Sequence, residues 1–156
     1  MGDKIKLNRE AIASLNLSVL ESEIERMFAN GTIPEESQIQ FVIDYQRAED
    51  DPREFSEIPE VRLWFIRADA LYPWLPYILD WKSGELVRYT AMLIPHQFSR
   101  SEGIIFNPEA LEIYVMHKVF TLTQWCRERK ITGSSRLISF AQLFGYEIEA
   151  DFLSQL

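Results

Sequence analysis

The side chains best suited to catalysis near neutral pH in this sequence are two histidines and one cysteine. His96 lies in a polar segment with Gln97, Arg100 and Glu102. An imidazole and a carboxylate held together there would suit general acid–base chemistry. The same residues would equally stabilise a turn, and the sequence assigns His96 no second catalytic partner. A small enzyme with an acid–base site at His96 is therefore one functional hypothesis.

The sequence does not favour metal, cluster or nucleotide sites. His117 follows Glu112 at a spacing of about 140° around a helix, whereas ligands that cooperate on a helix lie three or four residues apart. Cys126 is the only cysteine, so four thiolates for an iron–sulfur cluster are lacking, and we interpret it as a small apolar residue of a helix. The six glycines form no phosphate-binding loop. We predict no catalytic residue, no metal and no cofactor.

An aromatic connector has the composition of a protein interface. Residues 72–76 read Tyr-Pro-Trp-Leu-Pro, and the two prolines exclude a regular element while keeping the segment rigid. Tryptophan, tyrosine and arginine are enriched in binding hot spots, although these rings would alternatively close the core beneath a loop. The predicted partner-binding residues are Tyr72, Trp74, Trp81, Arg88, His96, Gln97 and Arg100.

Charge and composition limit the partners. The chain has 16 basic and 24 acidic residues, a net charge of −8, so nucleic acid and anionic membranes would be repelled. An acidic segment over residues 49–60 would attract a basic partner, or is simply a solvated loop. The sequence has neither an apolar run of about 20 residues nor a signal-peptide core. We expect a soluble, cytoplasmic protein.

The helices and strands that must position these residues can be predicted from the sequence pattern. This pattern, with the chain length, predicts a single α+β domain over residues 1–156. Alternating apolar residues predict strands over residues 4–7, 38–46 and 61–67, the second half-buried and antiparallel, the third central. A hairpin is predicted over residues 77–94 with Gly84 at a positive φ, and a helix over residues 85–93 is the alternative.

Three helices complete this prediction. The first is capped by a Ser18–Glu21 box and stopped at Asn30-Gly31, and the long second one begins at Asn107 and ends near residue 130. The third covers residues 135–144, is capped by Ser134 or Ser135 and stops at Gly145, while residues 96–105 form a polar loop. The expected architecture is an antiparallel sheet of about four or five strands packed against the long central helix, with two shorter helices.

Several consecutive stretches of the sequence are distinctive together. They are Ile-Pro-Glu-Val-Arg-Leu-Trp-Phe-Ile-Arg over 58–67, Tyr-Pro-Trp-Leu-Pro over 72–76, Leu-Asp-Trp over 79–81, Gly-Glu-Leu over 84–86, Ile-Pro-His-Gln-Phe-Ser over 94–99, Asn-Pro-Glu-Ala-Leu-Glu-Ile over 107–113 and Val-Met-His over 115–117. These stretches resemble the chlororespiratory-reduction-six family of cyanobacteria and chloroplasts. The resemblance covers roughly residues 38–146.

The resemblance implies an assembly factor for the photosynthetic NAD(P)H dehydrogenase-like complex. Such a factor would bind the iron–sulfur subunit NdhI during its maturation, as a chaperone-like protein rather than an enzyme. Chloroplast members carry a transit peptide, whereas residues 1–15 hold acidic residues and little serine or arginine, so we expect a cyanobacterial protein that meets thylakoid complexes only through its partner. A stable subunit of the complex is a third hypothesis.

Overall fold

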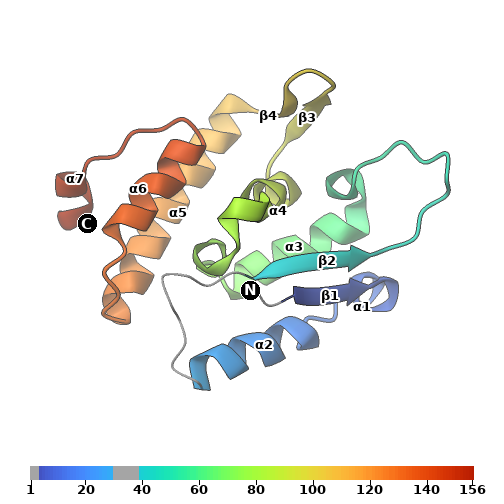
Figure 1. The fold of residues 1–156 in the computed structure, drawn as a ribbon, viewed down its shortest axis with the longest axis horizontal. Coiled ribbons are helices and arrows are strands. Elements are labelled where there is room, and N and C mark those ends of the chain that lie inside the picture. Colours follow the sequence, from blue (N-terminus) through green and yellow to red (C-terminus); the bar gives the residue numbers. More distant parts are fainter. Residues whose placement is uncertain (1–3, 30–38) are drawn as a thin grey trace. The chain divides into compact units, whose positions relative to one another are not determined.

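The computed structural model describes residues 4–29 and 39–156 (Figure 1). The chain divides into two compact units, Met1–Leu93 and Ile94–Leu156, and the predicted single domain stays a prediction. The described residues form seven α-helices and two sheets of two strands each. The α+β prediction therefore holds only as a mixture of helices and strands. The prediction of one antiparallel sheet of four or five strands packed on a long helix is wrong.

The sheet of the first unit is parallel. Strands β1 (Lys4–Asn8) and β2 (Gln40–Asp44) pair from Lys4 opposite Gln40 to Asn8 opposite Asp44. Both strands were expected from the sequence, but the antiparallel pairing is wrong. Parallel neighbours need a crossover, and the helices α1 (Arg9–Ala13) and α2 (Ser18–Ala29) lie between the two strands in the chain (Figure 1).

Helix α2 confirms the prediction for residues 18–28, with its apolar residues Leu20, Ile24 and Met27 buried. Its cap differs from the prediction. The Glu21 N–H donates to the Leu17 carbonyl, so the helix already includes Ser18 at its first position. The predicted stop at Asn30-Gly31 lies outside the described residues.

The first unit is otherwise helical. Helix α3 (Pro59–Leu71) replaces the strand predicted over residues 61–67. Proline suits the first helical position, Glu60 complements the helix dipole, and the buried residues recur at helical spacing. These buried residues are Val61, Trp64, Phe65 and Ala68.

Helix α4 (Glu85–Leu93) replaces the predicted hairpin and confirms its helical alternative. Gly84 has φ +83°, as expected, because it ends a 3₁₀ turn over Trp81–Ser83 in the left-handed region. A second 3₁₀ helix covers Leu75–Ile78, so part of the aromatic connector is regular after all. Pro76 fits there because early helical positions do not need an N–H donor, and Pro73 lies before this helix. A third 3₁₀ turn, Phe55–Glu57, precedes α3.

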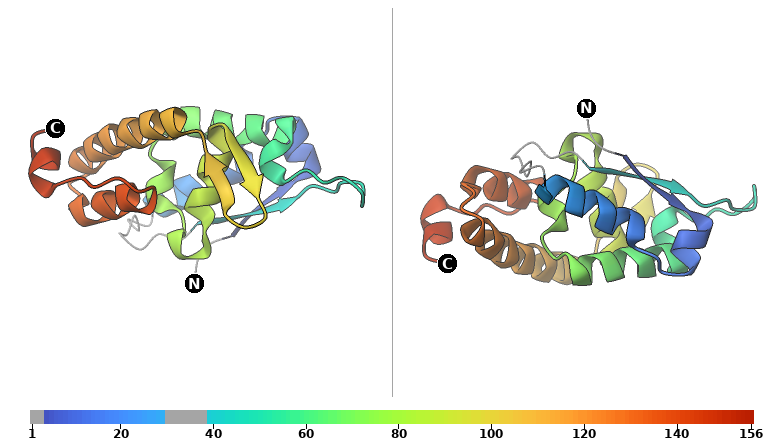
Figure 2. Two further views of the ribbon diagram at one scale, coloured as in Figure 1. Left: turned by 90° about the horizontal axis from the view of Figure 1, so that it is seen from above. Right: turned by 90° about the horizontal axis from the view of Figure 1, so that it is seen from below.

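The second unit begins with a hairpin that replaces the predicted polar loop. Strands β3 (His96–Ser99) and β4 (Gly103–Phe106) pair antiparallel. Helix α5 (Pro108–Glu128) follows, and the Asn107 side chain accepts the Ala110 N–H at 3.0 Å, as the cap prediction requires. Helices α6 (Ser134–Leu143) and α7 (Ala150–Ser154) complete the unit, and Figure 2 shows α5 and α6 side by side. The N-cap of α6 is Gly133, not a serine.

Each unit contains its own cluster of aromatic rings. In the first unit the rings of Phe41, Trp64, Phe65 and Tyr89 meet edge to face, with centroids 5.0–6.2 Å apart. In the second unit the rings of Phe106, Tyr114, Phe140 and Phe144 form a corresponding cluster. None of the helices in the described ranges combines the length and apolar character that a bilayer span requires.

Candidate functional site

The aromatic connector and the end of α2 form one surface in the first unit. The Trp74 ring lies 5.4 Å from the Phe28 ring and 5.6 Å from the Tyr72 ring, both in edge-to-face geometry. All three side chains are half-buried. We call the rings of Phe28, Tyr72 and Trp74 the Trp74 surface.

Local hydrogen bonds hold the connector in place. Tyr72 ends α3, and its N–H donates to the Ala68 carbonyl at 2.9 Å. The Leu75 N–H then donates to the Tyr72 carbonyl at 2.8 Å, closing a tight turn around Trp74. Because this backbone is already ordered, the rings would lose little conformational entropy when a partner binds.

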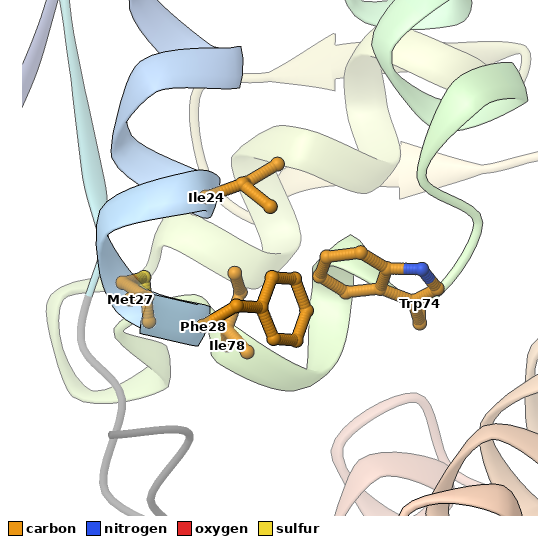
Figure 3. A pocket seen from close by; sticks show the side chains of 5 residues that line it. All are labelled: Ile24, Met27, Phe28, Trp74 and Ile78. Carbon is orange, nitrogen blue, oxygen red and sulfur yellow. The ribbon is translucent and has the colours of Figure 1, made fainter. Parts of the chain in front are cut away.

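An apolar pocket opens beside the Trp74 surface. Its lining consists of Ile24, Met27, Phe28, Trp74 and Ile78. Figure 3 shows the Phe28 ring beside the indole of Trp74, whose nitrogen lies on the side away from Phe28. Tryptophan and tyrosine, which provide two of the three rings of the Trp74 surface, are among the residues enriched in interface hot spots.

The rim of this surface is acidic. Burial raises the pKa of the Tyr72 hydroxyl above its ordinary value, and the negative charges of Glu21 and Glu25 raise it further. Both glutamates are exposed on α2. A partner with apolar residues surrounded by basic ones would therefore complement this part of the first unit.

Two other predicted residues, Trp81 and Arg88, make contacts within the first unit. The Trp81 indole N–H donates to the Pro76 carbonyl at 2.8 Å. Arg88 donates to both carboxylate oxygens of Glu85 at 2.8 Å and to the carbonyl of Phe41. The sequence predicted Arg88 across a hairpin, whereas the structure places it on α4, where it anchors β2.

Glu85 and Arg88 form an ion pair on α4 that also contacts β2. The Glu85 side chain is buried, and burial raises the pKa of its carboxyl. The hydrogen bond and charge of Arg88, and a hydrogen bond from the Phe41 backbone, lower that pKa. The net effect is a raised pKa. Arg88 and Glu85 thus both bind the backbone of Phe41, next to the point where Ile39 bridges Leu79. These contacts hold β2 to α4.

The remaining predicted residues lie on the β3–β4 hairpin of the second unit. His96 and Gln97 line a pocket of about 310 Å³, together with Pro95, Ile105, Phe106, Asn107 and Pro108. The ring nitrogen Nδ1 of His96 lies 3.0 Å from the Ile94 carbonyl. Arg100 is exposed in the turn between the strands.

The hairpin separates the groups of the hypothetical acid–base site. His96 pairs with Phe106 at one end, whereas Ser99 pairs with Gly103 beside the turn that carries Arg100 and Glu102. At about 3.4 Å per residue, His96 lies roughly 10 Å along the strand from Ser99. The geometry therefore does not bring His96, Arg100 and Glu102 together.

Within residues 4–29 and 39–156, no three His, Cys, Asp or Glu side chains are grouped so that they could hold a metal ion. Cys126 is buried in α5, as expected for a small apolar residue of a helix.

Sequence reasoning missed Phe28 as a site residue. It assigned Phe28 to the apolar stripe of α2 with Ile24 and Met27, both of which are buried. Phe28 instead stays half-buried because it lies at the border of that stripe, against Trp74. The position of Phe28 at the edge of the amphipathic stripe could have indicated that its ring is partly exposed. That position does not reveal which distant ring lies beside Phe28.

Comparison with known proteins covers nearly the whole chain. The family model for chlororespiratory reduction 6 matches residues 7–155. No solved structure matches the chain. Residues 7–155 include most of both compact units and every predicted site residue. The chain belongs to the chlororespiratory reduction 6 family.

Proposed function

We propose that this protein is an assembly factor for the photosynthetic NAD(P)H dehydrogenase-like complex and that it binds NdhI during maturation of that iron–sulfur subunit. Membership of the chlororespiratory reduction 6 family is consistent with a role linked to this complex. The protein acts by binding and is not an enzyme. It works in the cytoplasm of a cyanobacterium and meets thylakoid complexes through its partner.

The Trp74 surface is the observation that carries this proposal. Three half-buried rings beside an apolar pocket offer contact area on an ordered backbone, and Glu21 and Glu25 add negative charge near it. We infer that the surface covers an apolar part of immature NdhI that has basic residues around it. Such cover would prevent wrong contacts before the clusters are in place.

The cysteine content supports binding rather than cluster transfer. The only cysteine, Cys126, is buried, whereas holding an iron–sulfur cluster usually takes four thiolates. A cluster would therefore be held by NdhI, and this protein would protect the subunit that receives it.

A tagged copy of the protein, purified from a cyanobacterium with mass spectrometry of its partners, tests the proposal. We expect NdhI to co-purify without the completed complex. Recovery of the whole complex in a one-to-one ratio would instead identify a stable subunit. Recovery of neither would contradict the proposal.

A further inference from the structure

Helix α3 has an outer face that is exposed along its whole length. Its inner residues pack in the first unit, whereas two large apolar residues, Leu63 and Ile66, are 52% and 42% exposed. The exposed residues of this outer face are Pro59, Glu60, Leu63, Ile66, Arg67, Ala70 and Leu71. Isolated apolar residues on a surface are common, but these share one side of one helix.

The apolar residues of the outer face have the spacing of a helix-pairing seam. Pro59, Leu63, Ile66 and Ala70 follow one another at intervals of four, three and four residues. This alternation is the heptad spacing that places side chains along the contact line between two packed helices. The small side chain of Ala70 would allow the two backbones to approach closely at that end of the seam.

Charge identifies the orientation of the second helix. Glu60 and Arg67 lie on the same flank of the seam, seven positions apart. Glu60 contributes by its charge to the raised pKa of the Arg53 guanidinium, and both Glu60 and Arg67 are exposed. In an antiparallel pair of identical helices, Glu60 of each copy lies opposite Arg67 of the other. Leu63 of each copy then meets Ile66 of the other, and Pro59 meets Ala70.

We propose that the outer face of α3 binds the same face of a second copy of this chain, antiparallel and related by a two-fold axis. The face is self-complementary, as a two-fold interface requires. A parallel pair would set this flank of one helix against the opposite flank of the other, so Glu60 and Arg67 would not meet. One helix of 13 residues is about 20 Å long, so the interface is small and the dimer is weak, with a dissociation constant in the micromolar range or above.

Sedimentation velocity over a range of protein concentrations, with charge-reversed variants, tests this proposal. We expect the wild type to dimerise reversibly at high concentration. Glu60→Arg and Arg67→Glu should each weaken dimerisation about tenfold or more, because each creates two like-charge contacts. The double variant E60R/R67E restores opposite charges across the interface and should dimerise as the wild type does.

Lys82→Glu is the matched control, because Lys82 is an exposed cation of the same unit away from α3. It should leave dimerisation unchanged, and circular dichroism should show that all variants keep their helix content. A wild type that stays monomeric at every concentration overturns the proposal. A dimer that the single reversals leave intact, or that the double variant does not restore, also overturns it. The proposal is also overturned if the protein is monomeric and Leu63→Glu weakens its binding to NdhI. The outer face of α3 would then bind NdhI and not a second copy.

Discussion

At the residue scale, Glu85 shows how burial and an ion pair act against each other. Burial raises the pKa of its carboxyl, and Arg88 lowers it without reversing that direction. The folded-state pKa therefore lies above the unfolded value of 4.5. The folded state holds the proton more tightly, so this contribution to stability is complete below the unfolded pKa and is lost as the pH rises through the folded pKa.

Substitution Glu85→Gln should remove this pH dependence. The unfolding free energy of the wild type minus that of the variant should fall as the pH rises from below 4.5 through the folded-state pKa, because only the wild type has to ionise a buried carboxyl. Urea denaturation of both proteins at a series of pH values measures this difference. A difference that stays constant over that range would contradict the assignment.

Tyr72 should report the acidic rim of the Trp74 surface. Its hydroxyl pKa is raised above 10.0 mainly by burial and then by Glu21 and Glu25, so Glu21→Gln with Glu25→Gln should lower it only part of the way back. Titration of ring-labelled tyrosine by NMR measures the change. Glu23→Gln is the control, because Glu23 pairs with Arg26 on α2. An equal change of the Tyr72 pKa in this control would contradict a specific effect of Glu21 and Glu25.

At the element scale, α3 explains why a helix was mistaken for a strand. Val61, Leu63 and Phe65 alternate with polar or aromatic residues, which is typical of a strand. The buried residues, however, follow helical spacing from Val61 to Ala68, and Pro59 with Glu60 is a helix start. The exposed Leu63 and Ile66 concealed that period, since apolar residues were assumed to be buried.

The sheets show a different limit of sequence reasoning. The strand patterns of β1 and β2 were visible, but their pairing joins segments more than 30 residues apart, and local pattern does not specify a partner. The order strand, helix, strand was the available signal for a parallel crossover. The β3–β4 hairpin was missed because its polar residues, such as Gln97 and Ser99, suggested a loop.

The cap of α5 was predicted from sequence and can be tested directly. Asn107→Ala removes the acceptor of the Ala110 N–H and should lower the unfolding free energy by about 1 kcal/mol. Asn107→Ser should lose much less, because a serine hydroxyl also accepts this bond. Chemical denaturation measures both. Equal losses in the two variants would show that the side chain matters for another reason than capping.

At the scale of the whole molecule, the fold distributes the predicted partner-binding residues over two units, and their role in binding stays a prediction. Tyr72 and Trp74 do lie together, because two prolines and a tight turn fix the connector locally. Trp81 and Arg88 make contacts inside the first unit, and His96, Gln97 and Arg100 belong to the second. Composition identifies residues suited to an interface, but only the fold decides which of them share a surface.

The proposed function makes Trp74 the residue on which binding depends most. Trp74→Ala should weaken binding of purified NdhI by more than about 1 kcal/mol, because hot-spot tryptophans supply much of an interface's free energy. Its edge-to-face contacts with Phe28 and Tyr72 also predict a smaller loss of stability, which thermal unfolding measures separately. Phe98→Ala is the control, because Phe98 is an exposed aromatic residue of the hairpin.

Isothermal titration of cluster-free NdhI with the wild type, Trp74→Ala and Phe98→Ala, all folded at the temperature of measurement, tests the central claim most directly. Saturable binding by the wild type and Phe98→Ala, with a dissociation constant raised at least about fivefold in Trp74→Ala, is the predicted result. Binding of equal strength by all three proteins, or no binding by the wild type, would contradict the claim that this protein holds NdhI through the Trp74 surface.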